Sequence, residues 1–322
     1  MIWCPLGKPL RKEKNMRKTE LVAPAGNIEK LKLAFENGAD SVLLGGKKYN
    51  LRTGSHNFTD EELKTSIDYA KKNDKKIWVA LDIIPHNNEL EGLDEYVKYL
   101  EKLGVHGVMV GDLGVFQIVR EYSNLKISVL TQASNTNFRA VRMWYKLGAS
   151  RVILAREISI ENVKDIREKV PEIELEIYVH GAMHMSTSGR SLLTSYMSSK
   201  EENLDSNNAQ WKYSVEELTR PGEYMPVFED EHGTHIFHSK DLCSIENLDK
   251  ILELGVDAIR IEGRMMDNNY LTTAVRVYNE GINDFYNGNF TVKKEWLEDL
   301  EKASPRKFTR GFYFGVEGER SI

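Results

Sequence analysis

The feature that most constrains the fold is a repeated alternation of short apolar segments with longer amphipathic ones. Each apolar segment ends at Gly or polar residues, and an amphipathic segment of about 12–18 residues follows it. Several amphipathic segments end at Gly, as helix C-termini prefer. The predicted strands are 21–24, 41–44, 76–82, 107–110, 126–131, 151–155, 175–180 and 258–262, and the predicted helices are 27–37, 60–73, 90–103, 115–122, 137–147, 160–169, 244–254 and 271–286.

Eight strand–helix units predict an α/β fold, a TIM-like (β/α)8 barrel. The competing fold is an open doubly wound sheet, but no Gly-x-Gly-x-x-Gly follows the first strand. About 75 residues, 181–257, separate strands seven and eight, and a connection this long predicts a functional insertion. We divide the chain into a basic N-terminal arm, 1–19, the barrel with its insertion, 20–315, and a C-terminal tail, 316–322.

Composition excludes several classes of protein. The 322 residues carry a formal net charge of −5, which gives no global sign of nucleic-acid affinity. Cys4 and Cys243 are too far apart in sequence to suggest a disulfide framework, as is typical of a cytoplasmic protein. No run of about 18 apolar residues occurs, so no membrane partner is expected. The N-terminal arm lacks the apolar core of a secretory signal and is expected to be mobile, and either Met1 or Met16 fits as the start.

Polar side chains gather at the predicted carboxyl ends of strands, where barrel enzymes place their chemistry. They are Asp82, Asp112, Gln132, Asn135, Arg156, Glu157, His180, Glu262 and Arg264. We predict catalytic roles for His180, Glu157 and Gln132. The predicted substrate-binding residues are Arg52, Arg156, Arg190, Glu262 and Arg264. Guanidinium groups bind carboxylates and phosphates bidentately, so these arginines predict an anionic ligand, although ion pairs with Glu157, Glu262 and Asp112 are the alternative.

The segment after the seventh strand carries the most specific motif. Residues 176–196 read Glu-Ile-Tyr-Val-His-Gly-Ala-Met-His-Met-Ser-Thr-Ser-Gly-Arg-Ser-Leu-Leu-Thr-Ser-Tyr. This motif resembles the signature of the U32 peptidase family, the collagenase-like proteases. Segments 21–26, 45–52, 220–224, 239–243, 261–264 and 311–314 also resemble motifs of that family, in the same order. The two cysteines of the family signature are replaced here by His184 and Ser191.

The resemblance has a consequence for cofactors, because better understood relatives carry a [4Fe–4S] cluster on four cysteines. By motif position the four ligands would fall at His184, at Ser191, in the segment before Trp211, and at Cys243. Of these positions only Cys243 retains a thiol. We therefore expect no cofactor to be bound by this chain, in contrast to the iron–sulfur cluster of its relatives.

The resemblance also implies a function. Relatives hydroxylate tRNA uridine or 23S ribosomal RNA cytidine, or act as paired subunits in ubiquinone hydroxylation. The cosubstrate implied for tRNA is prephenate, a small dicarboxylate. We expect a role in 5-hydroxylation of tRNA wobble uridine, or in another RNA hydroxylation, as a cluster-free subunit or paralogue. The expected partners are tRNA or other RNA, a small dicarboxylate such as prephenate, and a cluster-bearing U32 paralogue. A separate alternative is that this chain is a non-enzymatic partner of such a paralogue.

A collagenase-like peptidase, with or without a metal, is the alternative. His180 and His184 are four residues apart, but the pair leaves a strand into a Gly-containing loop, so helical spacing does not align the imidazoles. Three further histidines lie in the insertion: His232, His235 and His238. No Gly-x-Ser-x-Gly elbow is present, and Cys243 is the only candidate thiol nucleophile. These patterns favour proteolysis less than RNA hydroxylation.

Overall fold

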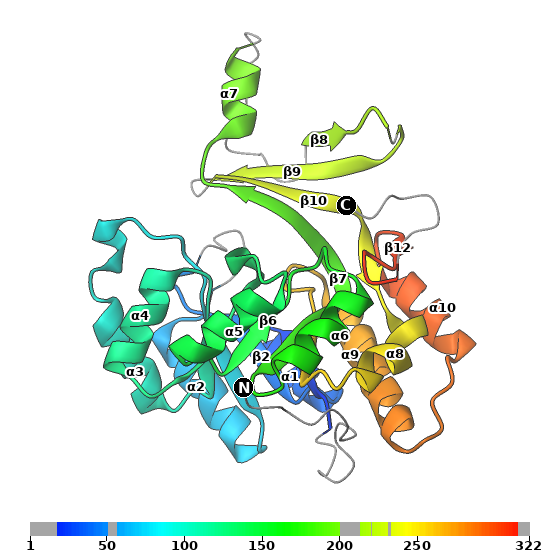
Figure 1. Cartoon of the computed structure of the whole chain (residues 1–322), viewed down its shortest axis with the longest axis horizontal. Helices are drawn as coiled ribbons and strands as arrows, with labels where there is room; N and C mark the ends of the chain where they lie inside the picture. Colours follow the sequence, from blue (N-terminus) through cyan, green and yellow to red (C-terminus); the bar gives the residue numbers. More distant parts are fainter. Residues whose placement is uncertain (1–17, 51–56, 200–212, 220, 231–232, 315–322) are drawn as a thin grey trace, which may run out of the picture.

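The computed structural model describes residues 18–50, 57–199, 213–219, 221–230 and 233–314. Within these ranges, eight parallel strands form a closed barrel (Figure 1). The strands follow chain order, and the last of them pairs with both the first and the seventh, which closes the sheet. They are β1 (Glu20–Pro24), β2 (Ser41–Gly45), β3 (Lys76–Leu81), β4 (Gly107–Val110), β5 (Lys126–Val129), β6 (Arg151–Ile153), β7 (Glu174–Ser188) and β11 (Ala258–Ile261).

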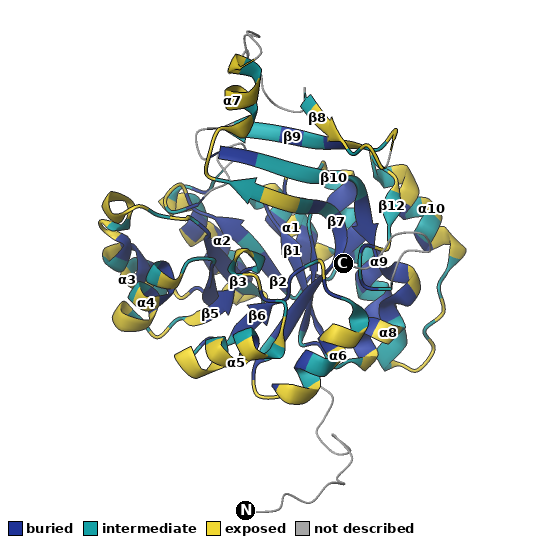
Figure 2. Ribbon diagram, turned by 45° about the horizontal axis from the view of Figure 1, so that its top comes forward, coloured by how far each residue is buried: buried dark blue, intermediate teal, exposed yellow. Residues whose placement is uncertain are grey.

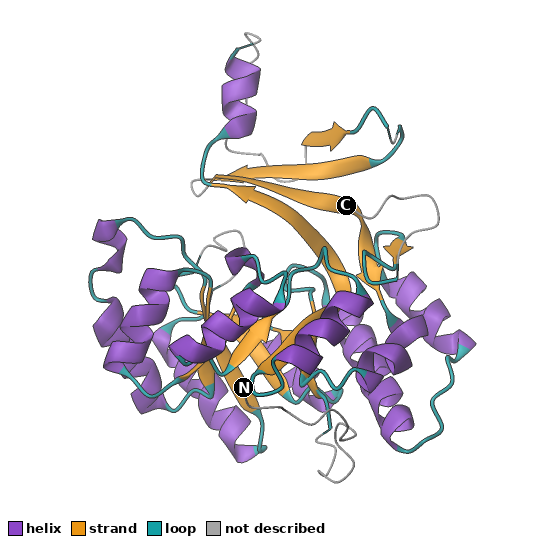
Figure 3. Ribbon diagram, in the orientation of Figure 1, coloured by secondary structure: helices purple, strands orange, loops and turns teal. Residues whose placement is uncertain are grey.

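Helices surround the barrel and connect its strands (Figure 3). The predicted (β/α)8 barrel is confirmed, and closure between β7 and β11 excludes an open sheet. The connecting helices are α1 (Ile28–Glu36), α2 (Asp60–Lys72), α3 (Leu93–Leu103), α4 (Leu113–Tyr122), α5 (Phe138–Leu147), α6 (Ile160–Lys169), α8 (Leu248–Glu253) and α9 (Asn268–Tyr286). Short 3₁₀ turns are η1 (Asn87–Leu90), η2 (Thr131–Ala133) and η4 (Ile245–Asn247).

Local sequence signals determine where several helices begin and end. Before α2, the Thr59 hydroxyl accepts a hydrogen bond from the Glu62 amide, and the Glu62 carboxylate accepts one from the Thr59 amide. Gly104 and Gly148 end α3 and α5 in the left-handed backbone region, as the sequence predicted. Helix α9 begins three residues before its predicted start, because Asp267 caps it through the amide of Tyr270.

An antiparallel sheet projects from the carboxyl end of the barrel, and we call it the arm (Figure 1). It consists of the outer half of β7, the strands β10 (Gly233–Cys243), β9 (Tyr224–Asp230) and β8 (Tyr213–Glu216), and helix α7 (Leu192–Ser198). Within the predicted insertion, 181–257, β9 and β10 pair as antiparallel strands. The predicted end of the seventh strand at His180 is wrong, because β7 runs on to Ser188 by pairing with β10.

Gly181 marks the point where β7 leaves the barrel. His180 pairs with Ile261 of the barrel, whereas Ala182 pairs with Asp241 of the arm. Gly181 has a φ of 103°, a conformation that favours glycine. A Cβ atom at this position would also overlap the carbonyl oxygen of Glu262. The His-Gly pair of the signature motif is therefore a structural junction between two sheets.

The C-terminal part of the described chain supports the base of the arm. Helix α10 (Lys294–Ala303) packs on α9 through the buried Trp296, whose indole donates to Glu280. Strand β12 (Phe308–Thr309) pairs with β10. Neither element was predicted from the sequence. Of the predicted N-terminal arm only Lys18 and Thr19 are described, and Thr19 is buried, with its hydroxyl donating to Val256.

Candidate functional site

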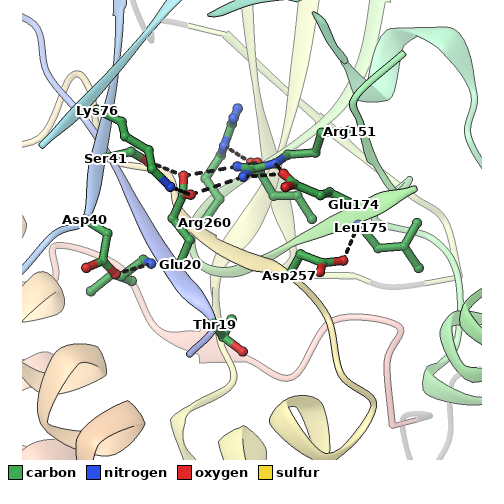
Figure 4. Close-up of polar contacts among 12 residues, drawn as sticks. Thr19, Glu20, Asp40, Ser41, Lys76, Arg151, Glu174, Leu175, Asp257 and Arg260 are labelled. Atoms are coloured by element: carbon green, nitrogen blue, oxygen red, sulfur yellow. Dashed lines mark hydrogen bonds and ion pairs between the residues drawn. The ribbon is translucent and has the colours of Figure 1, made fainter. Parts of the chain in front are cut away.

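Charged side chains fill the interior of the barrel, where branched apolar residues are usual (Figure 4). Arg151 is 2% exposed and contacts the carboxylates of Glu20 at 3.2 Å, Glu174 at 2.8 Å and Glu176 at 3.0 Å. Glu176 also pairs with Arg260 at 2.5 Å, and Lys76 pairs with Glu20 at 2.6 Å. Buried charges of opposite sign are thus matched within the barrel.

The environment of Glu20 decides its protonation. Burial alone would raise the pKa of this carboxyl, but the guanidinium of Arg151 and the ammonium of Lys76 hold the pKa well below its usual range. Glu20 also accepts a hydrogen bond from the hydroxyl of Ser41 at 2.7 Å. Glu20 therefore stays ionised at neutral pH, and its ion pairs connect β1 to β3 and β6.

A small cavity lies above this network, at the carboxyl end of the strands. Its volume of about 10 Å³ is enough for roughly one water molecule. Residues from several strands and from the loop after β11 line it: Ala23, Pro24, Leu43, Leu44, Ala80, Asp82, Leu130, Arg260, Ile261, Glu262 and Arg264. Two predicted substrate-binding residues, Glu262 and Arg264, therefore share one cavity, together with Arg260, which the sequence analysis did not select.

Arg156 belongs to the same end of the barrel and is engaged by neighbouring groups. Its guanidinium lies over the ring of Tyr178 at 3.7 Å from the centroid and donates to the carbonyl of Ala182 at 2.6 Å. It also pairs with Glu262 at 3.5 Å. These contacts agree with the alternative that Arg156 forms a structural ion pair. Its partner Glu262 lines the cavity.

Arg264 follows β11 and is held from two sides. Its Nη2 donates to the side-chain oxygen of Asn57, and its carbonyl oxygen accepts from the ammonium of Lys30 at 3.2 Å. The side chain is 6% exposed and lines the cavity. Arg264 is thus a guanidinium in a fixed position at the barrel mouth.

His180 lies in β7, but its ring packs away from the cavity. The ring contacts Tyr270 at 5.4 Å, Tyr278 at 5.5 Å and Phe308 at 5.3 Å between centroids, so it lies between β7, α9 and β12. It is 1% exposed, and burial lowers the pKa of the imidazole to about 3. His180 is therefore neutral at physiological pH, and its predicted catalytic role remains a prediction.

The other two predicted catalytic residues lie on the surface of the carboxyl end. Gln132 is exposed in η2, next to Gly111, and Glu157 is exposed in the turn after β6. The nearby Asn135 is fully buried and donates to the carbonyl oxygens of Leu130 and Ile153, both at 2.9 Å. Gln132, Arg156, Glu157 and Arg264 thus lie at the same end of the barrel as predicted, while only Arg264 lines the cavity.

The predicted pocket of four arginines is wrong in one member. Arg190 lies beyond the outer end of β7, where its carbonyl accepts from the hydroxyl of Thr234 at the start of β10. Strand β7 continues for eight residues beyond His180, to Ser188, before Arg190 follows, so Arg190 belongs to the arm. The error follows from the predicted end of strand seven. Arg52 lies outside the described residues.

The structure does not bring the predicted cluster positions together. Cys243 pairs with His180 at the barrel, whereas His184 pairs with Phe237 within the arm. Ser191 is farther still, because the next residue, Leu192, bonds to Thr234. Of the predicted positions only Cys243 is a cysteine, and the one before Trp211 lies outside the described residues. The residues present therefore do not fit a thiolate-held cluster.

Other metal chemistry finds little support among the described side chains. The hydroxyl of Thr187 bonds to both His184 at 2.8 Å and His235 at 3.3 Å. Within the described ranges, no group of three or more His, Cys, Asp or Glu side chains is placed to hold a metal ion. His232 lies outside these ranges.

Several charged and polar side chains of the site lie within the strands themselves and were not predicted from the sequence. Glu174, Glu176 and Tyr178 alternate along β7, and Arg260 lies in the middle of β11. Charges at alternate positions of an otherwise apolar strand were the available signal, because such positions face one side of a sheet. Asn57 carried no such signal, since its partner Arg264 is more than 200 residues away in sequence.

None of the helices in the described ranges combines the length and apolarity needed to cross a bilayer.

Over 94% of its length, the chain is 38% identical to "tRNA hydroxylation protein P1" of Bacillus subtilis and covers 72% of that protein. It is 32% identical to "tRNA hydroxylation protein P2" of the same organism, with 93% of this chain and 98% of that protein covered. It is also 27% identical to "Collagenase" of Porphyromonas gingivalis, with 94% and 75% covered.

The family assignment rests on the extent of these similarities. Residues 26–322 match the family described as "Peptidase family U32". The match includes the barrel from α1 onward and the whole arm, as well as the site at the carboxyl end of the strands. The resemblance seen in the motifs therefore extends to nearly the full chain, which belongs to the U32 peptidase family.

Proposed function

We propose that this chain takes part in the hydroxylation of tRNA uridine. The observation that carries the proposal is the 38% identity, over 94% of this chain, to a protein named for tRNA hydroxylation. The second Bacillus subtilis relative carries the same functional name. The proposed site is the carboxyl end of the barrel, with Arg264, Glu262 and Arg260 around the cavity.

The chemistry of this site supports a small dicarboxylate such as prephenate as the second ligand. The cavity itself admits roughly one water molecule, so a larger ligand must lie over its rim. Arg264 offers a guanidinium at that rim, and a guanidinium forms charge-assisted hydrogen bonds to carboxylates. In this proposal the chain binds and orients the dicarboxylate beside the RNA base.

The proposed partner is a cluster-bearing U32 paralogue, because this chain lacks the thiolates for a cluster of its own. Of the positions His184, Ser191 and Cys243, only Cys243 supplies a thiol. Two relatives of this chain, named tRNA hydroxylation proteins P1 and P2, come from the same organism, Bacillus subtilis, which supports the idea that such proteins occur as paralogues. The present chain would then be the cluster-free member of a pair.

The test is mass spectrometry of tRNA nucleosides after deletion of the gene, in strains with and without each U32 paralogue. We expect 5-hydroxyuridine-type nucleosides to fall on deletion and to return with the wild-type gene. Arg264→Gln should fail to restore them, whereas Lys164→Gln, an exposed position on α6, should restore them fully. Unchanged nucleoside levels in every strain would disprove the proposal.

A peptidase function has less support, despite the family name and the collagenase relative. Burial raises the pKa of the Cys243 thiol to about 11, which leaves little thiolate for nucleophilic attack. His180 pairs with Cys243 across the strands, but its ring packs against aromatic side chains. Hydrolysis of gelatin by the pure protein, abolished in Cys243→Ser, would favour the peptidase instead.

A further inference from the structure

The loop that follows β2 has a constrained backbone. Tyr49 has a φ of 59°, in the left-handed region that bulky side chains rarely adopt. Its hydroxyl donates to the carbonyl of Glu91 at 2.7 Å, and its ring lies 5.4 Å from the ring of Tyr96 on α3. A Cβ atom at Gly46 would overlap the hydroxyl of Tyr96. Contacts with Glu91, which precedes α3, and with Tyr96 of α3 therefore hold Tyr49 in an unfavourable conformation.

Asn50, the residue after Tyr49, is also held in a defined position and contacts a residue at the barrel mouth. Asn50 is 6% exposed, and its side-chain amide donates to the Oδ1 of Asn57 at 3.2 Å. A Cβ atom at Gly45 would overlap that amide, so the Asn50 side chain occupies space that only glycine leaves open. Within the family-like motif 45–52, Gly45 leaves room for the Asn50 side chain, and Asn50 in turn fixes the position of the Asn57 side chain.

Asn57 makes the connection to the proposed site. Its Oδ1 accepts from Arg264 Nη2 as well as from Asn50. The backbone of the Arg264 loop is held separately, because the Lys30 ammonium donates to the carbonyl oxygens of Arg264 at 3.2 Å and Met266 at 2.6 Å. Asn57 therefore restrains the guanidinium while Lys30 restrains the main chain.

We propose that Asn57 is a positioning residue, which holds the Arg264 guanidinium at the cavity for a ligand carboxylate. The carboxylate ligand rests on the proposed function, whereas the restraint of Arg264 does not. A long side chain that is already restrained loses less conformational freedom when a ligand binds. The strained loop would then serve ligand affinity, as strain near functional sites often does.

The restraint can be measured without a ligand by NMR of arginine side chains labelled with ¹⁵N. The Arg264 guanidinium signal is assigned by its loss in Arg264→Lys. We expect this signal to be lost through broadening in Asn57→Leu, which has no acceptor, and to be retained in Asn57→Asp, which keeps one. Asn268→Leu is the matched control, because Asn268 bonds to Glu29 instead. An unchanged Arg264 signal in Asn57→Leu would overturn the proposal.

The ligand half is tested by calorimetric titration with prephenate. We expect Asn57→Leu to bind prephenate about tenfold more weakly than wild type, and Asn268→Leu to bind it normally. Equal affinity of Asn57→Leu and wild type would overturn the positioning role of Asn57 in ligand binding, and no binding of prephenate by wild type would overturn the assignment of Arg264 as a carboxylate-binding group. Neither result depends on the nucleoside measurements, so failure here and failure of the proposed function can be told apart.

Discussion

The two halves of β7 belong to one strand but lie in different surroundings. The inner half, up to His180, is paired on both edges by parallel barrel strands, and its side chains are almost all buried (Figure 2). The outer half pairs with β10 alone and has exposed residues such as Met185. A strand that is buried on both faces must carry apolar side chains, or polar side chains that all have partners. A strand with one face open to solvent tolerates polar side chains there.

The charges of the two regions differ in the same way. In the barrel, Arg151, Glu176 and Arg260 are at most 2% exposed and pair with one another. In the arm, Lys240 and Glu223 form an ion pair whose side chains are 34% and 28% exposed. The charges of the barrel are therefore part of its packing, whereas this ion pair of the arm remains in contact with solvent. Mutations of paired charges should consequently lower the free energy of unfolding more in the barrel than in the arm.

The largest effect is expected for Arg151→Met. This change leaves Glu20, Glu174 and Glu176 without their central partner in a buried site, which should lower the free energy of unfolding by about 3–5 kcal/mol. Urea unfolding provides the measurement. The control is Lys169→Met, whose pair with Asp165 is exposed, and a change within about 0.5 kcal/mol is expected there. Equal effects of the two variants would remove the contrast between buried and solvated charges.

Gly181→Ala tests the junction between the two regions. Both the φ of 103° and the overlap with the Glu262 carbonyl oppose a side chain, so we expect a loss of about 2–4 kcal/mol in unfolding free energy. Gly288→Ala is the matched control, because Gly288 also has a positive φ but open space around its Cα. A loss of only about 1 kcal/mol is expected there. Similar losses at both glycines would show that close packing at the junction is unimportant.

The buried His180 predicts a dependence on pH. Its pKa is about 3 in the folded protein, against an ordinary value of 6.5, so the unfolded state binds the proton first as pH falls. The stability contributed by neutral His180 is fully present above pH 6.5 and is lost as pH falls towards 3. Between pH 7 and pH 5 the loss should be about 2 kcal/mol more in wild type than in His180→Phe. Identical pH profiles of urea unfolding would contradict this prediction.

The smallest effect is expected in the arm, for Glu229→Gln. The Glu229 carboxylate accepts from the amides of Leu193 at 2.8 Å and Thr194 at 3.1 Å, and so caps helix α7. We expect faster hydrogen exchange at these two amides, with global stability reduced by about 1 kcal/mol or less. Glu172→Gln, at an exposed position on the barrel, should change neither quantity. A global loss comparable to that of Arg151→Met would show that arm and barrel unfold together.

Part of the candidate site could be predicted from the sequence. Residues that follow a strand directly, such as Arg156, Glu262 and Arg264, were placed correctly at the carboxyl end, because strand order in a barrel fixes which ends meet. The sequence placed His180 in its strand, but it could not predict towards which neighbouring element the imidazole ring points. A bulge between β7 and β11 shifts the register at this residue, and its ring turns towards α9. Such irregularities depend on both strands and are not encoded locally.

Local signals were sufficient to predict the barrel, because apolar periodicity, Gly at helix ends and capping residues such as Thr59 all act within a few residues of chain. The length of β7 depends on tertiary contacts instead, since its outer half forms only by pairing with β10, some 50 residues later. It also decided which charges are buried: Arg151 and Glu20 are 131 residues apart, and Asn57 and Arg264 are 207 apart. Hydrogen bonds and ion pairs require proximity in space, and proximity over such separations arises only when the barrel has closed.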